Sequence, residues 1–381
     1  MKNMPGQNME DILSRCLRDR QYRRKVNEKI NEMVKLIDAG HALEDSPLAD
    51  LARSRIRVRK KYDLWDRIFM DSYSAQYSTP EIIARYRAGR IDEDVLDIGS
   101  GSGMQCIMFG LRSGCTGIER EKIRYISAMI NAEVYGSKSR FRNEDFYEAT
   151  FGSADLVFSD PLRMNTRNVR DLIPSPYDIM EKIKADAYVF DLPPHADLRT
   201  IEFSGEKEYI SVGGVLSRFT VYIGRHAESD FSAHILPAGI HLTGSRYTGG
   251  FAEPRIYDYI YVLDPAVSEA GLFEDFSDMA LISKDERRTV LSHASFRRNF
   301  PGSVFSVYGI YDWPGLEAEI ASVRPNKVYL RYSIPSDQYY EVTRRLEQRN
   351  GSGDVYVFRF SDRYVLANKI YDVNYNNISN L

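Results

Sequence analysis

The segment Asp94–Gly103 (DVLDIGSGSG) constrains the fold more than any other part of the chain. A short apolar run ends in Asp97, and Gly99, Gly101 and Gly103 then follow at every second position. Glycine permits a tight turn and lets a ligand lie against the backbone. In a doubly wound α/β domain, such a turn at the carboxyl end of the first strand forms an adenosine pocket. We therefore predict this pocket here, with Asp97 accepting a hydrogen bond or offsetting a positive charge.

The spacing of the glycines separates two classes of cofactor. A dinucleotide-binding turn has the pattern G-x-G-x-x-G, and its sixth position, counted from Gly99, holds Met104 in this chain. The pattern D-x-G-x-G-x-G instead resembles motif I of the class I S-adenosylmethionine (SAM)-dependent methyltransferases. This resemblance implies SAM as the cofactor and a Rossmann-like, doubly wound α/β sheet. Taken alone, the loop is also compatible with an ordinary turn.

Further acids end the next two predicted strands. Glu119 stands about 20 residues beyond the glycines, where nucleotide-binding α/β folds place an acid on the ribose hydroxyls; a solvated carboxylate is the alternative. A third strand is predicted within Arg140–Phe146. The resemblance to the methyltransferases implies that Asp145 contacts the adenine amine and that Phe146 covers the ring, with Glu144 as a competing acid.

The candidate catalytic loop follows the fourth predicted strand. Ala154–Pro161 predicts that strand, and Lys184–Pro194 predicts a fifth. Proline stiffens the chain where it leaves the sheet, although Asp-Pro is also common at ordinary turns. The segment resembles motif IV of the same methyltransferases, where the methyl acceptor lies. This resemblance implies that Asp160, Pro161 and Arg163 are catalytic.

The residues at this loop, and the cysteines away from it, limit which atom of an acceptor base could be methylated. An exocyclic base amine would need an acceptor for its proton, which Asp160 or the carbonyl of Ser159 would supply. Enzymes that methylate such amines place an aromatic side chain, which stacks the flipped base, where this chain has Arg163. An arginine plane can stack or grip phosphate, so amine methylation is in doubt. Cys106 and Cys115 stand away from the loop, which disfavours a cysteine adduct at pyrimidine C5.

The composition indicates a protein of the reducing cytosol. The chain has 381 residues, enough for two or three domains, and a net charge of −3. Its three cysteines have no disulfide or metal spacing. No apolar run approaches the roughly 18 residues of a membrane span. We expect a cytoplasmic protein with no membrane contact, and a monomer is favoured over an oligomer. We expect no metal site, because four histidines cluster in sequence only: His195, His226, His234 and His241.

Three regions are expected along the chain: a helical region at 1–90, a methyltransferase domain at 91–300 and a small α+β domain at 301–381. Residues 1–70 carry 16 Lys and Arg against 11 Asp and Glu. Their most basic run is Arg53–Lys61, with six cations in nine residues. Such a run could grip phosphates or form a solvated helix face.

Three segments together resemble a group of class I methyltransferases that carry a C-terminal THUMP-like domain. They are Ile83–Ile91 before the glycine loop, Tyr257–Leu272 with its Asp-Pro-Ala-Val, and Lys327–Tyr332. The group's motif IV is usually D-P-A-R-R, whereas this chain has Met164 in place of the second arginine. The resemblance implies an RNA substrate, either tRNA or rRNA.

Two other functions are compatible with the sequence. The altered motif IV would suit a non-catalytic RNA-binding or scaffold protein that retains a SAM pocket. The near-neutral net charge would suit a methyltransferase for a protein or a small molecule. The residues alone do not identify the RNA, the base atom or the position that is methylated.

Overall fold

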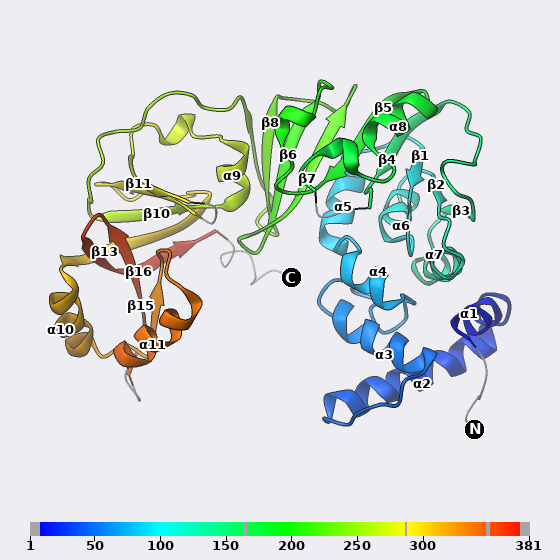
Figure 1. Cartoon of the computed structure of the whole chain (residues 1–381), viewed down its shortest axis with the longest axis horizontal. Coiled ribbons are helices and arrows are strands. Elements are labelled where there is room, and N and C mark those ends of the chain that lie inside the picture. Colours follow the sequence, from blue (N-terminus) through cyan, green and yellow to red (C-terminus); the bar gives the residue numbers. More distant parts are fainter. Residues whose placement is uncertain (1–7, 163–165, 286–287, 348–350, 374–381) are drawn as a thin grey trace. The chain divides into compact units, whose positions relative to one another are not determined.

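The computed structural model describes residues 8–162, 166–285, 288–347 and 351–373 and divides into two units (Figure 1). The first comprises Met1–Glu206 and Arg218–Glu228, and the second comprises Lys207–Ser217 and Ser229–Leu381. These limits differ from the boundaries that we expected at residues 90 and 300. Among the helices of the described residues, none combines the length and the apolar character needed to cross a membrane.

A mostly parallel sheet forms the centre of the first unit. Its order is β3-β2-β1-β4-β5-β7, in which β1 to β5 are parallel and β7 is antiparallel to β5. The order reverses between β1 and β4, and ligands bind at such a switch point in open α/β sheets. The five strands predicted from the sequence are thereby confirmed. The strands are β1 (Val95–Ile98), β2 (Cys115–Ile118), β3 (Arg140–Arg142), β4 (Ala154–Ser159), β5 (Ala185–Leu192) and β7 (Val215–Ile223).

Helices connect these strands and begin and end at suitable residues. The helix α7 ends at Gly136, which has a φ of 67° and closes the last turn without the steric cost of a Cβ. The helix α8 begins with a capping box, in which Ser175 and Asp178 accept from each other's backbone N–H. The connecting helices are α6 (Met104–Gly110), α7 (Lys122–Tyr135) and α8 (Pro176–Lys182).

Five helices precede the sheet and share its core. Ile12 and Ile30 pack in one cluster with Ile126 and Ile130 of α7. A boundary at residue 90 would cut through this cluster, and for this reason the helices belong to the first unit. Side chains of Asn8, Asp19, Ser46 and Asp71 cap four of the helices. The helices are α1 (Met9–Arg18), α2 (Arg20–Asp38), α3 (Pro47–Val58), α4 (Ser72–Tyr77) and α5 (Glu81–Gly89).

A buried charge cluster joins α5 to the sheet. Arg87 and Asp191 are both 0% exposed, and the Nη2 atom of Arg87 lies 3.1 Å from Oδ2 of Asp191. Arg218 on β7 reaches the same oxygen at 3.0 Å. Arg87 also donates to Gln105 of α6 at 2.6 Å and to Thr220 at 3.1 Å. Four segments far apart in the sequence are thus fixed by one carboxylate and its donors.

The basic run Arg53–Lys61 is largely engaged within the chain. Arg55 is buried and donates to the side chains of Asn27 and Asn31. Lys61 donates to the carbonyls of Ala75 and Gln76, and burial lowers its pKa to about 8. Ion pairs to Asp45 and Asp38 hold Arg53 and Arg59. These contacts favour a structural role for the basic run over a role in binding phosphates.

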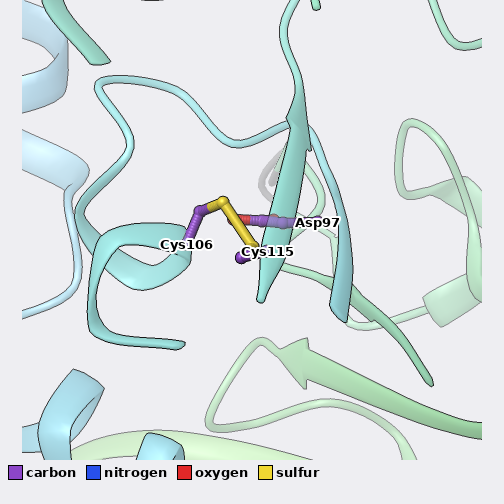
Figure 2. A group of neighbouring side chains, drawn as sticks. All are labelled: Asp97, Cys106 and Cys115. Atoms are coloured by element: carbon purple, nitrogen blue, oxygen red, sulfur yellow. A yellow bond between two sulfur atoms is a disulfide. The ribbon is translucent and has the colours of Figure 1, made fainter. Parts of the chain in front are cut away.

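Cys106 and Cys115 form a disulfide, contrary to the prediction from their spacing. Cys106 lies on α6 and Cys115 begins β2, and the packing of that helix on the strand brings their Cα atoms to 5.6 Å, within the usual range for a bridge. Figure 2 shows Asp97 of β1 beside the two sulfur atoms. Cys16 is a free, buried cysteine.

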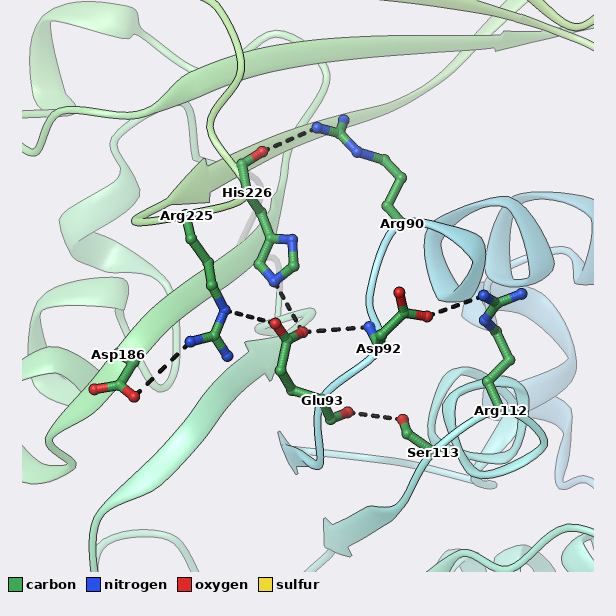
Figure 3. A network of polar contacts seen from close by, with 8 residues as sticks. All are labelled: Arg90, Asp92, Glu93, Arg112, Ser113, Asp186, Arg225 and His226. Atoms are coloured by element: carbon green, nitrogen blue, oxygen red, sulfur yellow. Dashed lines mark hydrogen bonds and ion pairs between the residues drawn. The ribbon is translucent and has the colours of Figure 1, made fainter.

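A polar network closes the amino-terminal end of β1, away from the glycine loop (Figure 3). Glu93 accepts from Arg225 at 2.5 Å and lies 3.0 Å from Nε2 of His226. Arg90 donates to the carbonyl of His226 and pairs with Glu206. The network therefore ties the start of β1 to the segment that follows β7.

The second unit contains a seven-stranded sheet of order β11-β12-β10-β13-β16-β15-β14 and the strands β6, β8 and β9. Its β10 pairs with β13, so a boundary at residue 300 would divide this sheet. The strands β15 and β16 form an antiparallel hairpin, with Ser361 at φ 56° in its turn. The strands are β6 (Glu206–Val212), β8 (Phe231–Leu236), β9 (Ile240–Gly244), β10 (Tyr259–Leu263), β11 (Ala280–Lys284), β12 (Thr289–His293), β13 (Gly302–Tyr311), β14 (Lys327–Leu330), β15 (Asp354–Phe360) and β16 (Arg363–Asp372), and the helices are α9 (Pro265–Ala270), α10 (Trp313–Val323) and α11 (Ser336–Leu346).

We predict that Arg87→Met destabilises the protein by about 3 kcal/mol, because it removes one of the two arginines that pair with the buried Asp191 and also breaks the buried bonds to Gln105 and Thr220. Urea denaturation followed by circular dichroism measures the change. The control is Arg112→Ala, which breaks a surface pair with Asp92 and should cost under about 1 kcal/mol. Equal losses in the two variants would contradict the structural importance of the buried cluster.

Candidate functional site

The glycine loop after β1 has the conformation that its sequence predicts. Gly99, Gly101 and Gly103 have φ values of 77°, 56° and 86°, in the left-handed region that side chains disfavour. A Cβ atom built on Gly99 or Gly101 would meet nothing within 4 Å, whereas one on Gly103 would lie 2.8 Å from the Cβ of Ala128. Gly103 is thus required for packing against α7, and the first two glycines border open space.

Asp97 lies beneath this loop as a buried carboxyl group. It is 2% exposed, and within the described part of the chain its Oδ2 atom has no hydrogen-bond partner. Burial raises its pKa to about 8, with Asp160 and Glu119 adding repulsion, while Arg87 acts in the opposite direction. A group or molecule that donates a hydrogen bond or carries positive charge would be favoured beside it.

Glu119 follows β2 and folds back onto the glycine loop. One carboxylate oxygen accepts from the N–H of Gly101 at 2.8 Å and the other from that of Glu121 at 2.8 Å. Burial raises its pKa, although these two bonds act against the shift. Each carboxylate oxygen has two lone pairs, so Glu119 can hold the loop and still accept from hydroxyl groups.

The residues after β3 lie in a turn tied to β2. Asn143 donates to the carbonyls of Glu119 and Arg120, which joins the ends of the two strands. Asp145 accepts from the N–H of Tyr147 at 2.8 Å. Phe146 is buried and stacks on Phe151, with ring centroids 5.8 Å apart. Its ring is thus largely covered by neighbouring side chains.

The loop after β4 is described only in part. Asp160 is half-buried and Pro161 is buried, and Asp160 is close enough to Asp97 to raise the pKa of that carboxyl. Ser159 donates to the carbonyl of Ile98 at 3.0 Å, which fixes the end of β4 against β1. Arg163 lies outside the described residues, as does Met164.

An aromatic pair beside this loop was not identified from the sequence. Tyr73 and Tyr77 of α4 lie 4.7 Å apart between ring centroids and are 39% and 55% exposed. Burial raises the pKa of Tyr73, Arg124 acts in the opposite direction, and Tyr77 and Asp160 add repulsion. An ion pair of 3.2 Å between Arg124 and Asp71, the N-cap of α4, holds this helix against α7.

A buried asparagine connects the helical region to the glycine loop. Asn131 of α7 accepts from the N–H of Phe69 at 2.8 Å and donates to its carbonyl at 2.9 Å. It also donates to the carbonyl of Ser102 at 3.1 Å. Such a clamp had no signal in the sequence, because it joins residues about 30 and 60 positions apart.

Comparison with known proteins supports the fold. A protein of Porphyromonas gingivalis W83, provisionally described as a methyltransferase, matches with a TM-score of 0.71 and 17% identity over 92% of this chain and 97% of that chain. An RNA methyltransferase of Salinibacter ruber in complex with S-adenosyl-L-homocysteine matches with a TM-score of 0.29 and 18% identity over 38% of this chain and 90% of that chain. The first likeness establishes the fold, and the second is too weak to carry an argument. No protein-family model and no curated protein matches the chain.

We predict a pH dependence of stability that arises from Asp97. Its pKa is raised from 3.8 to about 8 by folding, so between these values the folded protein binds more protons than the unfolded chain. Its contribution to stability is therefore present at acidic pH and is lost as the pH rises towards 8. Relative to Asp97→Asn, which cannot ionise, the wild type should lose up to about 1.4 kcal/mol per pH unit across this window.

Urea denaturation of both proteins at pH 5, 7 and 9 measures this difference. The comparison removes the contribution of other titrating groups, because these are common to the two proteins. A constant difference in the free energy of unfolding across the three pH values would show that Asp97 is ionised throughout in the folded state.

Proposed function

We propose that this protein is a SAM-dependent methyltransferase that acts on structured RNA. The observation that carries the first part is the glycine loop at the switch point, where Gly99 and Gly101 border open space above a buried carboxyl group. The hydrogen-bond acceptor Oδ2 of Asp97 lacks a partner among the described residues, which fits an adenosyl cofactor with a cationic amino acid moiety. The likeness to the P. gingivalis protein over 92% of the chain supports the same class.

Different residues of the chain are proposed to bind different parts of this cofactor. We assign the loop Gly99–Gly103 and Asp97 to its methionyl part, Glu119 to the ribose hydroxyls, and Asp145 with Phe146 to the adenine. SAM supplies a methyl group on a positively charged sulfur. The protein then has to orient the acceptor in line with that methyl and exclude water.

The acceptor side is assigned to Asp160, Pro161 and Arg163, together with Tyr73. Asp160 would accept a proton from the acceptor, and proline would fix the direction of the loop. The exposed ring of Tyr73 offers a surface on which an unstacked base can lie. RNA is favoured for this reason and because of the resemblance of the C-terminal α+β elements to a THUMP-like domain. The proposal includes a cytoplasmic setting, where tRNA and rRNA are substrates; it rests on the RNA acceptor and not on the cysteines, two of which form a disulfide.

We predict that Gly99→Ala weakens SAM binding at least tenfold, because the added methyl group enters the space assigned to the cofactor. Gly40→Ala is a matched control: it has a φ of 85° against 77° for Gly99, and its Cβ would likewise meet nothing within 4 Å. Both variants carry the same backbone strain. Isothermal titration calorimetry with SAM should therefore separate them, and similar affinities would contradict the assignment of the loop.

We predict that Asp160→Asn binds SAM normally and loses methyl transfer by at least about 100-fold, in the range of general acid–base catalysis. Transfer of radiolabelled methyl is measured into small RNA, rRNA and protein fractions from cells that lack the gene. Label in one RNA fraction, lost in the variant, would support the proposal.

The same assay separates the alternatives. Label in protein alone would replace RNA by a protein acceptor. SAM binding without label in any fraction would favour a scaffold or a small-molecule enzyme. Full transfer by Asp160→Asn would remove this residue from the mechanism.

A further inference from the structure

Within the described residues, two groups of three side chains have metal-ligating atoms close together. The first is Asp97 with Cys106 and Cys115, whose sulfur atoms form a disulfide and are therefore not thiolate ligands. The second is Glu208, His234 and His241, in the second unit. We propose that this second group is a binding site for a divalent transition-metal ion of the Zn²⁺ class, independent of the proposed methyltransferase site.

The strand register places all three side chains on one face. The strands β6 and β8 are parallel, with Glu208 opposite Ser232 and Ile210 opposite His234. The strands β8 and β9 are antiparallel, with His234 directly opposite His241. Since side chains two residues apart share a face and opposite residues do too, Glu208 points to the same side as both histidines. The arrangement follows from backbone pairing and not from chance side-chain rotamers.

The distances between the three ligand atoms would fit a metal centre after a small movement of the His241 side chain. The ligand atoms lie within 4.8 Å of one another, and the two imidazole rings have centroids 5.4 Å apart. A tetrahedral Zn²⁺ with bonds of about 2.0–2.1 Å separates its ligand atoms by roughly 3.4 Å. Glu208 and His234 are 0% and 8% exposed, whereas His241 is exposed. His241 can therefore rotate towards the other two without disturbing core side chains.

The donor set selects the kind of ion. Two imidazole nitrogens and one carboxylate suit Zn²⁺ and related transition metals, whereas Ca²⁺ and Mg²⁺ prefer oxygen ligands alone. Three protein ligands leave a fourth position for water or another ligand.

Full-length protein, freed of any histidine tag and stripped with EDTA, is loaded with Zn²⁺ and dialysed. Metal content is then measured by plasma mass spectrometry, and affinity by titration calorimetry. We expect one equivalent of Zn²⁺ in the wild type. Glu208→Gln and His241→Ala should each weaken binding at least about 100-fold, since even residues that only support a ligand account for 10–100-fold.

The control is His293→Ala, which removes a histidine of the same unit that lies outside the proposed site. Its Nε2 atom is 3.8 Å from Oδ2 of Asp278. It should bind Zn²⁺ like the wild type. Because His241 is exposed, its variant should keep the circular dichroism spectrum of the wild type. Absence of retained Zn²⁺ in the wild type would overturn the proposal. The proposal would also be overturned if Glu208→Gln and His241→Ala retained as much Zn²⁺ as the wild type, because the ion would then lie elsewhere.

Discussion

The buried carboxylate of Asp191 and its two arginines determine how the first unit is assembled. Arg87 lies on α5, which precedes the sheet in the sequence. Arg218 lies on β7, more than one hundred residues after Arg87. Arg87 and Asp191 are both 0% exposed, so these two opposite charges depend on each other for compensation. Arg87 also opposes the rise in the pKa of Asp97. The same side chain thus supports the fold and favours the ionised form of Asp97 in the candidate site.

The cost of burying Asp97 is best understood as preparation for a ligand. Burial is the main cause that raises the pKa of Asp97, and Asp160 and Glu119 add repulsion at the switch point of the sheet. The ionised form of Asp97 is therefore disfavoured when no cation is present. A positively charged ligand would reverse this effect, because it would stabilise the ionised carboxylates. Binding of such a ligand and ionisation of Asp97 are therefore expected to be coupled.

The strands and the glycine loop were predicted from local patterns. Alternating glycines and apolar runs are each contained within about ten residues, so the pattern and the structure that it predicts lie in the same short segment. The distant pairings had no such signal. The disulfide depends on the packing of α6 against β2, and the pair His234–His241 depends on the register of β8 with β9. Arg55 belongs to a run of cations that suggests a surface, yet it is buried against two asparagines. The core that the N-terminal helices share with α7 had no signal for the same reason, since it joins segments distant in sequence.

The placement of α4 has a consequence for acceptor choice. Asp71, the N-cap of α4, pairs with Arg124 of α7, and Asn131 of α7 clamps Phe69 just before α4. These contacts anchor α4 to α7, whereas the residues proposed to hold the cofactor lie at the ends of β1, β2 and β3. Among the residues proposed for the acceptor, Tyr73 thus comes from a different part of the chain than the residues proposed for the cofactor. Changes in α4 can then alter which acceptor is accepted while the cofactor pocket stays intact, as expected where binding and chemistry are supplied by separate elements.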